Sequence, residues 1–540
     1  MAVLESEKVA TGGAAAIAAL EAAGVEVVFG IPGVHTLALY DALHDSSIRH
    51  VLARHEQGAG FMADGYARAT GKPGVALIIT GPGITNVATP VGEAYADSSP
   101  VVVISSQVER EWAGKMRGNL HDLRDQSGLM SVVTKRSTSV TSFDQIASTV
   151  FNAVRESVSG RPRPTHVELP LDILAETGVS TPPEPSGGYR PAPTRDEVER
   201  AADLLAHARK PLIYIGGGAV SAGDALSELA TLLGAPVLES TMGKGIVAED
   251  HPYCLGHAWN PWSADNPLDE LLAASDLVLV IGTKLGAQET NYWKMPLPKT
   301  MIRVDVDPDE LSLNYGAPTL GIAADAQATV DALLEALRAR RHAPEGTSTD
   351  EVADYKRRVL ADGEEIAFAP YIEALRRAIP REGIIVQDMT MMSYRMNDSY
   401  PAYAPRTYLF PSNYGTLSFS LPAAIGAKIG KPHLPVVAVV GDGGFQFTMA
   451  EVATAVQHDV TLPIVIFNDS TYTAVDQAMK QSFGRRAMAT ELKNPDYVKL
   501  ADAYGIPGVR ALSPDALADA VKQAFASDGP TIIDVPIPRV

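Results

Sequence analysis

Short runs of consecutive apolar residues recur along the chain, and helix-like stretches separate them. The runs are rich in β-branched residues and are bounded by glycine or proline. Continuous apolar strands of this kind are typical of parallel sheets that helices cover on both faces. The predicted strands are Val25–Phe29, Val75–Thr80, Val101–Ser105, Pro211–Ile215, Leu277–Ile281, Met301–Val306, Ile384–Gln387, Val436–Val440 and Pro463–Phe467.

Two stretches interrupt this alternation and are predicted to be linkers. Thr177–Thr194 is rich in proline, and Arg341–Asp350 is polar with one proline and one glycine. They divide the 540 residues into three blocks of ordinary domain size, namely residues 1–176, 195–340 and 355–540. Because strands and helices alternate in each block, we expect an α/β protein with three doubly wound parallel-sheet domains.

The composition narrows the class of partner. A formal net charge of -19 argues against nucleic acid or an anionic membrane as a partner. The one cysteine, Cys254, excludes an intramolecular disulfide and a cluster of thiolates on zinc. The first residues lack the basic-then-apolar pattern of a signal peptide, and the longest apolar runs are too short to span a bilayer. We therefore expect a cytoplasmic protein with no membrane partner.

The last block contains two polar turns that follow neighbouring predicted strands. Val436–Val440 runs into Gly441-Asp442-Gly443-Gly444, a helix is predicted over Thr448–Gln457, and Pro463–Phe467 runs into Asn468-Asp469-Ser470-Thr471. Both turns emerge at the carboxyl ends of parallel strands, where α/β proteins bind ligands. Glycines let the backbone approach a phosphate, and the N-terminus of the following helix favours negative charge.

Asp442 and Asp469 lie one in each turn, and Mg²⁺ commonly takes one or two carboxylates beside phosphate oxygens. A Gly-Asp-Gly tripeptide taken alone is more often a plain turn, and Asn-Asp-Ser a helix cap. Two such turns at both ends of one strand-helix-strand unit favour a ligand site more strongly. From these residues alone, the plain-turn interpretation and the anion and metal site stay equally open.

The spacing of the two turns resembles the thiamin diphosphate (ThDP) signature of the superfamily of 2-oxo acid decarboxylases and acetolactate synthases. The resemblance implies that the Asp442 side chain, the Asp469 side chain and the Thr471 backbone carbonyl hold Mg²⁺. That signature normally ends in Asn-Asn, so Asp469 adds a negative charge beside the diphosphate, which costs affinity unless nearby donors offset it. The remaining residues that the resemblance implies around the diphosphate are Gly441, Gly443, Gly444 and Tyr472.

A second stretch, Arg54–Arg68, followed by Gly71–Val75 and Thr80–Gly83, resembles the pyrimidine-binding domain of the same superfamily. A plain interpretation of Arg54–Arg68 is an amphipathic helix whose charged residues face solvent. The resemblance instead implies that Glu56 contacts N1′ of the aminopyrimidine of the cofactor. The other cofactor-binding residues that it implies in this domain are Pro32, Thr80 and Asn86.

The chemistry of this superfamily explains why a carboxylate is needed at Glu56. ThDP loses its C2 proton to its own 4′-imino group, and that tautomer forms when N1′ is protonated. A partly buried carboxylate with a raised pKa shares that proton. The C2 ylide then adds to a 2-oxo carbon, and an enamine forms as CO₂ leaves. The cofactor carries the chemistry, and the protein orients and tunes it.

Asn413–Gly426 resembles the segment that bends the cofactor in this superfamily. The resemblance makes Leu417 the apolar wedge and the Gly415 carbonyl an acceptor for the 4′-amino group. It places Asp388 and Thr390 beside the diphosphate or the aminopyrimidine. Because members build each site from two subunits, it also implies a homodimer at minimum and, as is usual for the family, a homotetramer.

Two histidines are candidates for proton transfer at the substrate. His35 lies in Gly30–His35, which follows a predicted strand, and His121 lies where acetolactate synthases have Phe-Gln-Glu. An imidazole titrates near neutrality and suits proton transfer to an enamine or an alkoxide. An ordinary histidine is more often a surface or hydrogen-bonded structural residue, so both interpretations stay open.

Phe29–Thr36, Arg54–Arg68 and Tyr414–Leu417 resemble the 5-guanidino-2-oxopentanoate decarboxylases of arginine catabolism, whereas Tyr472–Val475 resembles benzoylformate decarboxylases. The implied function is a ThDP- and Mg²⁺-dependent decarboxylase of a small 2-oxo acid. The first substrate to test is 5-guanidino-2-oxopentanoate or a related 2-oxo acid derived from an amino acid. An acetolactate synthase-like carboligase is the alternative, and a non-catalytic scaffold of the same fold is a remoter one.

The middle block contains Gly216-Gly217-Gly218 directly after a predicted strand. Taken alone, these glycines suggest a dinucleotide site, such as that of a nicotinamide-dependent oxidoreductase, and acetolactate synthases bind FAD in the matching domain. Three glycines without the full fingerprint are a weak motif. The expected cofactors are therefore ThDP and Mg²⁺, with FAD kept only as an alternative.

Overall fold

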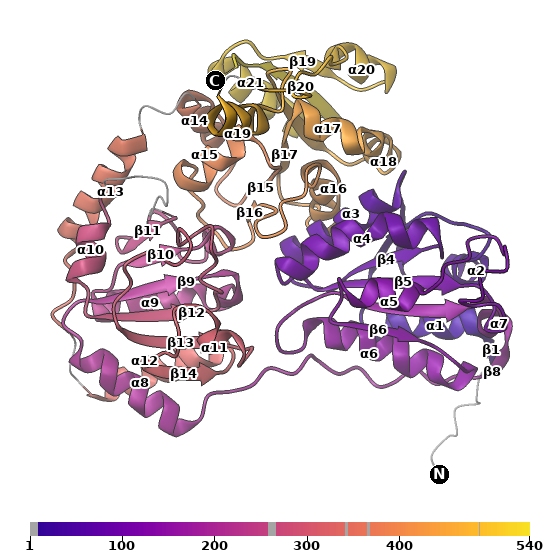
Figure 1. Ribbon diagram of the computed structural model, residues 1–540, viewed down its shortest axis with the longest axis horizontal. Helices are drawn as coiled ribbons and strands as arrows, with labels where there is room; N and C mark the ends of the chain where they lie inside the picture. Colours follow the sequence, from indigo (N-terminus) through magenta and orange to yellow (C-terminus); the bar gives the residue numbers. More distant parts are fainter. Residues whose placement is uncertain (1–8, 258–265, 341–343, 364–367, 485, 540) are drawn as a thin grey trace.

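The computed structural model describes residues 9–257, 266–340, 344–363, 368–484 and 486–539. Three parallel sheets of six strands each, flanked by helices, make up most of the molecule (Figure 1). This arrangement confirms the predicted fold class of three doubly wound parallel sheets. A small antiparallel sheet pairs β1 (Val9–Thr11) with β8 (Thr177–Val179), so the first residues of the predicted proline-rich linker form a strand.

The first sheet has the strand order β3-β2-β4-β5-β7-β6. Its strands are β2 (Val27–Gly30), β3 (Arg49–Leu52), β4 (Gly74–Ile78), β5 (Val101–Gln107), β6 (Arg136–Ser139) and β7 (Thr165–Pro170). The helices of this part are α1 (Gly12–Ala22), α2 (Leu37–His44), α3 (Glu56–Thr70), α4 (Pro82–Ala96), α5 (Gln126–Ser131), η1 (Phe143–Gln145), α6 (Ile146–Val158) and α7 (Leu171–Ala175).

The central sheet has the order β11-β10-β9-β12-β13-β14. Its strands are β9 (Pro211–Ile215), β10 (Val237–Glu239), β11 (Cys254–Gly256), β12 (Leu277–Ile281), β13 (Thr300–Asp305) and β14 (Leu320–Ala323). The helices of this part are α8 (Arg195–His207), η2 (Gly217–Ala219), α9 (Gly223–Leu233), η3 (Thr241–Gly243), α10 (Asp269–Ala274), α11 (Glu310–Leu313), α12 (Ala326–Arg340) and α13 (Thr349–Gly363).

The last sheet has the order β16-β15-β17-β18-β20-β19. Its strands are β15 (Ile384–Gln387), β16 (Tyr408–Leu409), β17 (Val436–Gly441), β18 (Leu462–Asn468), β19 (Gly508–Arg510) and β20 (Pro530–Pro536). The helices of this part are α14 (Ala369–Ala378), α15 (Met391–Ser399), α16 (Ser420–Gly430), α17 (Asp442–Thr448), η4 (Met449–Glu451), α18 (Val452–Gln457), α19 (Thr473–Phe483), α20 (Tyr497–Ala503) and α21 (Pro514–Phe525).

All three sheets reverse their winding between two inner strands, at β2/β4, β9/β12 and β15/β17. Ligands of open α/β sheets bind in the crevice outside the carboxyl ends of the strands at such a reversal. The segments that follow these strands begin at Ile31 and Ile79 in the first sheet, at Gly216 and Gly282 in the central sheet, and at Asp388 and Asp442 in the last, where Asp442 also begins α17. The topology thus brings Pro32, Thr80, Asp388 and Asp442, four of the predicted cofactor residues, to the reversal points.

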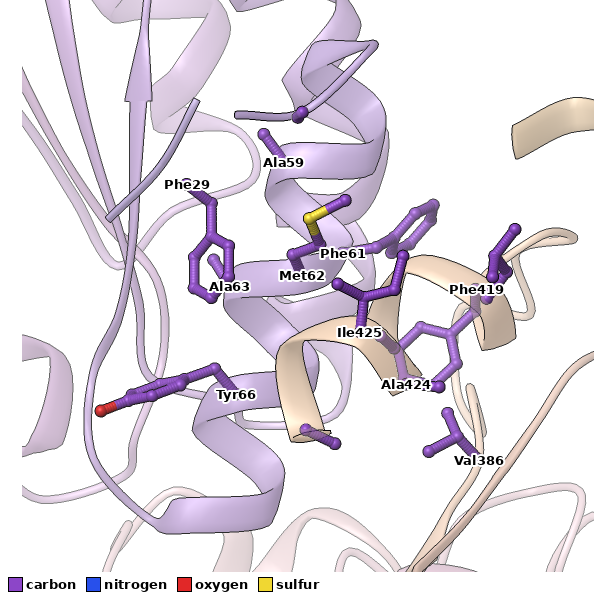
Figure 2. Packing of buried hydrophobic residues seen from close by; sticks show 14 of the residues in the cluster. Phe29, Ala59, Phe61, Met62, Ala63, Tyr66, Val386, Phe419, Ala424 and Ile425 are labelled. Atoms are coloured by element: carbon purple, nitrogen blue, oxygen red, sulfur yellow. The ribbon is translucent and has the colours of Figure 1, made fainter. Parts of the chain in front are cut away.

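Helices α3 and α16 join the first and last parts of the chain into one hydrophobic core (Figure 2). Glycines permit the close crossing, because a Cβ at Gly65 would lie 2.0 Å from the Ala423 carbonyl oxygen and one at Gly426 1.9 Å from that of Met62. Beside the crossing, Phe61 and Phe419 stack edge to face with centroids 5.7 Å apart. The contact fixes the orientation of the helix that begins at Glu56.

One local prediction and one plain interpretation differ from the structure. The predicted helix over Thr448–Gln457 begins six residues earlier, at Asp442, and is broken by the 3₁₀ turn Met449–Glu451. The plain interpretation of Arg54–Arg68, a helix whose charged residues face solvent, does not hold, because Asp64 and Arg68 are buried as an ion pair of 2.8 Å. Arg68 also donates to Asp97, directly after α4, and to the Phe410 carbonyl in the last part of the chain. These partners are distant in sequence, so the local pattern does not reveal that the pair is buried.

Among the described helices, none is long and apolar enough to cross a membrane.

Candidate active site

Asp442 and Asp469 lie together at the carboxyl ends of β17 and β18. The Asp442 carboxylate accepts hydrogen bonds from the Ser470 amide at 2.8 Å and from Asn494 Nδ2 at 2.5 Å. The Asp469 carboxylate accepts one from the Thr471 amide at 3.0 Å and one from the Thr473 hydroxyl. Burial raises the pKa of Asp442, and the Asp469 carboxylate adds to the rise. Two adjacent carboxylates of this kind favour a cation between them.

The surroundings of these carboxylates fit a metal-bound diphosphate. Gly443 cannot carry a side chain, since a Cβ there would lie 2.4 Å from the Tyr472 ring. The Thr471 hydroxyl oxygen is buried and has no hydrogen-bond partner among the described residues. Carboxylate and backbone oxygens are the donors that Mg²⁺ prefers. The residues present therefore suit Mg²⁺ and a diphosphate, and the assignment of Asp442, Asp469 and Thr471 as ligands stays a prediction.

Asp388 lies at the reversal point of the last sheet, and its carboxylate oxygens accept hydrogen bonds from backbone amides of the protein. It accepts hydrogen bonds from the amides of Met389 at 2.8 Å, Ser418 at 2.9 Å and Ser420 at 3.4 Å. Burial raises its pKa to about 6. Asp388 thus fixes the backbone that directly follows Leu417.

Thr390, Gly441 and Gly444 surround Asp388 and Asp442. The Thr390 hydroxyl accepts from the Ser393 amide at 3.1 Å and so caps α15. A Cβ at Gly441 would lie 3.1 Å from Thr390, and one at Gly444 would lie 3.4 Å from Asp388. The loop before α16 carries Gly415, whose φ of +75° only glycine adopts without strain.

Glu56 is the first residue of α3, where a carboxylate interacts favourably with the helix dipole. Its Oε2 accepts a hydrogen bond from Asn86 Nδ2 at 3.0 Å, so two predicted cofactor residues are in contact. The carboxylate of Glu451 holds the turn that precedes Glu56, because it accepts from the amides of Arg54 at 3.1 Å and His55 at 3.0 Å.

Pro32 and Thr80 lie in the loops after β2 and β4. Pro32 is exposed, whereas Thr80 is buried and donates its hydroxyl to Gln126 Oε1 at 2.6 Å. No hydrogen bond among the described residues joins Glu56 to Asp442 or its neighbours. Completion of the site by a second copy of the chain therefore stays a prediction.

His35 and His121, predicted separately, are hydrogen-bonded through their Nδ1 atoms at 3.0 Å, with ring centroids 4.8 Å apart. His35 is 8% exposed, and its pKa is lowered, mainly by burial and to a smaller extent by the nearby His121. The charge of Glu109 opposes this shift of the pKa. The backbone at His121 has a φ of +66° and packs on Gly81, where a Cβ would lie 2.7 Å from the His121 carbonyl oxygen. One ring must donate and the other accept, so the pair holds a bridging proton.

Comparison with known proteins decides the family. Models of the thiamine pyrophosphate enzymes, another name for ThDP enzymes, match residues 10–129 as the N-terminal TPP binding domain, residues 198–333 as the central domain and residues 388–535 as the C-terminal TPP binding domain. The chain belongs to the thiamine pyrophosphate enzyme family. The resemblance to the ThDP superfamily is thereby confirmed.

Relatives of this thiamine pyrophosphate enzyme include decarboxylases and synthases. It is 38% identical to a probable 2-ketoarginine decarboxylase of Pseudomonas aeruginosa, over 98% of this chain and 95% of the relative. It is 33% identical to a probable acetolactate synthase large subunit of Methanocaldococcus jannaschii, over 97% and 92%. It is 35% identical to an acetolactate synthase large subunit of Mycobacterium tuberculosis, over 97% and 87%. The chain is thus a ThDP-dependent lyase or carboligase.

The central part of this thiamine pyrophosphate enzyme contains a cavity of 260 Å³ at its own reversal point. The predicted glycine motif contributes Gly217 and Gly218 to its wall, beside Gly282, whose carbonyl accepts from the Gly218 amide at 2.9 Å. Cationic residues from all three parts of the chain also line it, among them Arg161, Lys284 and Arg406. The weak glycine motif therefore faces a cavity, and FAD as its ligand stays an untested alternative.

Sequence reasoning missed Asn494, which donates to Asp442 and, at 3.0 Å, to the side-chain oxygen of Asn468. It lies 25 residues beyond Asp469, in a segment without strand or helix periodicity. An isolated antiparallel bridge between Thr471 and Glu491 brings it back to the turn. An Asn followed by Pro, as here, predicts only a turn, so no local signal identifies this residue.

Proposed function

We propose that this ThDP enzyme is a Mg²⁺-dependent decarboxylase that converts a 2-oxo acid to CO₂ and an aldehyde. The first substrate to test is 5-guanidino-2-oxopentanoate, also called 2-ketoarginine, because a relative of 38% identity is named for that reaction. The observation that carries the choice of decarboxylation is the His35–His121 pair with its 3.0 Å contact.

The roles proposed for the chain's own residues follow from their surroundings. The carboxylates of Asp442 and Asp469 and the Thr471 carbonyl would hold Mg²⁺, and Asn494 would keep Asp442 in place. When bound, ThDP supplies an electron sink beside the scissile bond of the 2-oxo acid. Glu56, oriented by Asn86 and the helix N-terminus, would hold a proton at N1′ of the cofactor.

The histidine pair would supply the proton that distinguishes simple decarboxylation from carboligation. After CO₂ leaves, the former carbonyl carbon must receive a proton if an aldehyde is to form. A ring nitrogen of the pair would donate that proton, and the second ring would take up another from solvent. Because His35 is almost fully buried and its pKa is lowered, its proton leaves more readily than that of an ordinary imidazolium.

A carboligase is the second candidate, because acetolactate synthases match at 32–35% identity over nearly the whole chain. In that reaction a second carbonyl compound, and not a proton, captures the same carbon. The homotetramer, the cytoplasmic location and the use of Mg²⁺ belong to this proposal as well. The remote alternative of a non-catalytic scaffold requires that the purified protein bind ThDP and turn over no 2-oxo acid.

Release of CO₂ from a panel of 2-oxo acids tests the proposal. The panel contains pyruvate and acids with branched, aromatic, amino and guanidino side chains, each supplied with ThDP and Mg²⁺. We expect one preferred substrate and one aldehyde for each CO₂. Hydroxyketone products would favour the carboligase, and no release by ThDP-loaded protein would favour the scaffold.

A further inference from the structure

Two buried carboxyl groups at the end of α4 hold the loop that carries the predicted cofactor-bending residues. Glu93 lies in the last turn of this helix and is fully buried, and Asp97 is the residue that directly follows the helix. Glu93 Oε2 accepts from the Thr416 amide at 3.0 Å and from the Thr416 hydroxyl at 2.8 Å. Thr416 stands directly between Gly415 and Leu417.

Asp97 holds the start of the same loop. Its Oδ2 accepts from the Ser412 amide at 2.9 Å, and its Oδ1 from the Asn413 amide at 3.0 Å and from Asn413 Nδ2 at 2.7 Å. The first and last parts of the chain are thus joined by a clamp of two carboxyl groups over residues 412–416. In the middle of the clamped segment, the Tyr414 ring lies over Gly92, where a Cβ would meet it at 3.0 Å.

The charges around the clamp do not balance if both carboxyl groups are ionised. Among the residues that the structure describes, the cation in direct contact is Arg68 on α3, which donates to Asp97 at 2.9 Å and is already paired with Asp64 at 2.8 Å. Ionised Glu93 would add a third buried carboxylate to a single guanidinium, which burial makes costly. Its Oε1 is also buried without a partner among the described residues.

A proton on Glu93 removes both difficulties. A carboxylic acid is neutral, and its hydroxyl would donate to the Asp97 carboxylate, the neighbour that raises the pKa of Glu93. Burial and the Asp97 charge raise the pKa of Glu93 to about 8, whereas Arg68 and the Asn413 and Ser412 donors keep the pKa of Asp97 low. The pair therefore holds one proton at neutral pH, in the manner of two carboxyl groups that cannot both ionise.

We propose that Glu93 is a positioning residue for the ThDP site, a protonated acid that links Asp97 to Thr416 and so sets the places of Gly415 and Leu417. This inference rests on the proposed roles of Gly415 and Leu417. It predicts that cofactor binding weakens as the pH rises and Glu93 ionises. Because binding then requires the protonated acid, ThDP affinity is complete well below the pKa of about 8 that Glu93 has in the folded apoprotein. It is lost as the pH rises through about 8, since the apoprotein must take up a proton to bind.

The experiment titrates ThDP into apoprotein with Mg²⁺ at a series of pH values and follows binding by calorimetry. For the wild type, Kd should rise by about 10-fold between about pH 6.5 and about pH 9. Glu93→Gln imitates the protonated acid, so its Kd should stay within about 3-fold of the wild-type value at low pH and show no rise at high pH. Glu93→Ala loses both contacts to Thr416 and should bind about 10-fold more weakly throughout.

Glu239→Gln is the matched control. Glu239 is also a buried carboxyl group, and it accepts from the amides of Gly245 and Val247 at 3.1 Å in the central part of the chain, away from the clamped loop. This variant should keep both the wild-type Kd and its rise at high pH. A rise that persists in Glu93→Gln, or an unchanged Kd in Glu93→Ala, would overturn the inference. Wild-type protein that binds no ThDP would instead overturn the proposed function.

Discussion

Replacing His121 with glutamine removes one ring of the histidine pair and keeps a polar side chain that can still contact His35. The two Nδ1 atoms lie 3.0 Å apart, so the rings share one proton and act as a unit. A general acid contributes about 10²–10⁴-fold to a rate. We expect His121→Gln to lower kcat for aldehyde formation by about 100-fold, which corresponds to about 2.7 kcal/mol of transition-state free energy.

The double variant with His35→Gln decides whether the rings work together. If they act as a unit, removing both costs little more than removing one, so the double variant should also lose about 100-fold. Independent rings would multiply their losses to about 10⁴-fold. The rate also reports the pKa, because a proton donor loses activity as the pH rises through its pKa. Removal of His121 takes away the second cause that lowers the pKa of His35, so this decline should move to higher pH.

Aldehyde formation is followed with an aldehyde dehydrogenase and NAD⁺, and ThDP affinity is measured in parallel. The control is His251→Gln, which replaces a half-buried histidine of the central part whose pKa burial also lowers. The control should keep wild-type kcat, and all variants should keep wild-type ThDP affinity. A loss below about 3-fold in His121→Gln, or a multiplied loss in the double variant, would refute the shared-proton account.

Three further predictions concern the cofactors. Glu56→Gln should lower kcat by at least about 100-fold, while the circular dichroism spectrum and the Mg²⁺ affinity stay unchanged. Turnover near the wild-type rate would show that Glu56 does not have the proposed role. Asp442→Ala should abolish Mg²⁺-dependent ThDP binding, and Asn494→Ala should weaken Mg²⁺ binding about 10- to 100-fold. Both affinities are measured by calorimetry, and unchanged values would contradict the assignment of the metal ligands. The purified protein should show no flavin absorbance and release no FAD on denaturation, whereas a stoichiometric flavin would show that the central cavity holds FAD.

The fold and the approach of the two polar turns in the last block were predictable because their signals are local. Three predicted strands, Pro211–Ile215, Leu277–Ile281 and Ile384–Gln387, match the structure residue for residue, since all their residues except Gln387 are apolar or aromatic. Asp442 and Asp469 were found because a turn at the end of a parallel strand has a recognisable composition. The turn that carries Asp442 lies beside the turn that carries Asp469 because β17 pairs with β18.

What the sequence did not predict depends on contacts between distant segments. Glu93 appears as one more helical glutamate, and only the packing of α4 against residues 412–416 shows its partners. The ion pair of Arg68 with Asp64 has the spacing of an ordinary surface pair, yet it is buried by the crossing of α3 and α16. Asn494 is brought to Asp442 by the isolated bridge between Thr471 and Glu491, and no periodic pattern in the sequence predicts this bridge.

Decarboxylation of 5-guanidino-2-oxopentanoate in D₂O, with ThDP and Mg²⁺, tests the central claim most directly. Loss of CO₂ and capture of a solvent-derived proton should give 4-guanidinobutanal in equal amount to CO₂, with one deuterium on the aldehyde carbon detected by NMR. A hydroxyketone in place of the aldehyde, or no CO₂ from ThDP-loaded protein with any acid of the panel, would contradict the account.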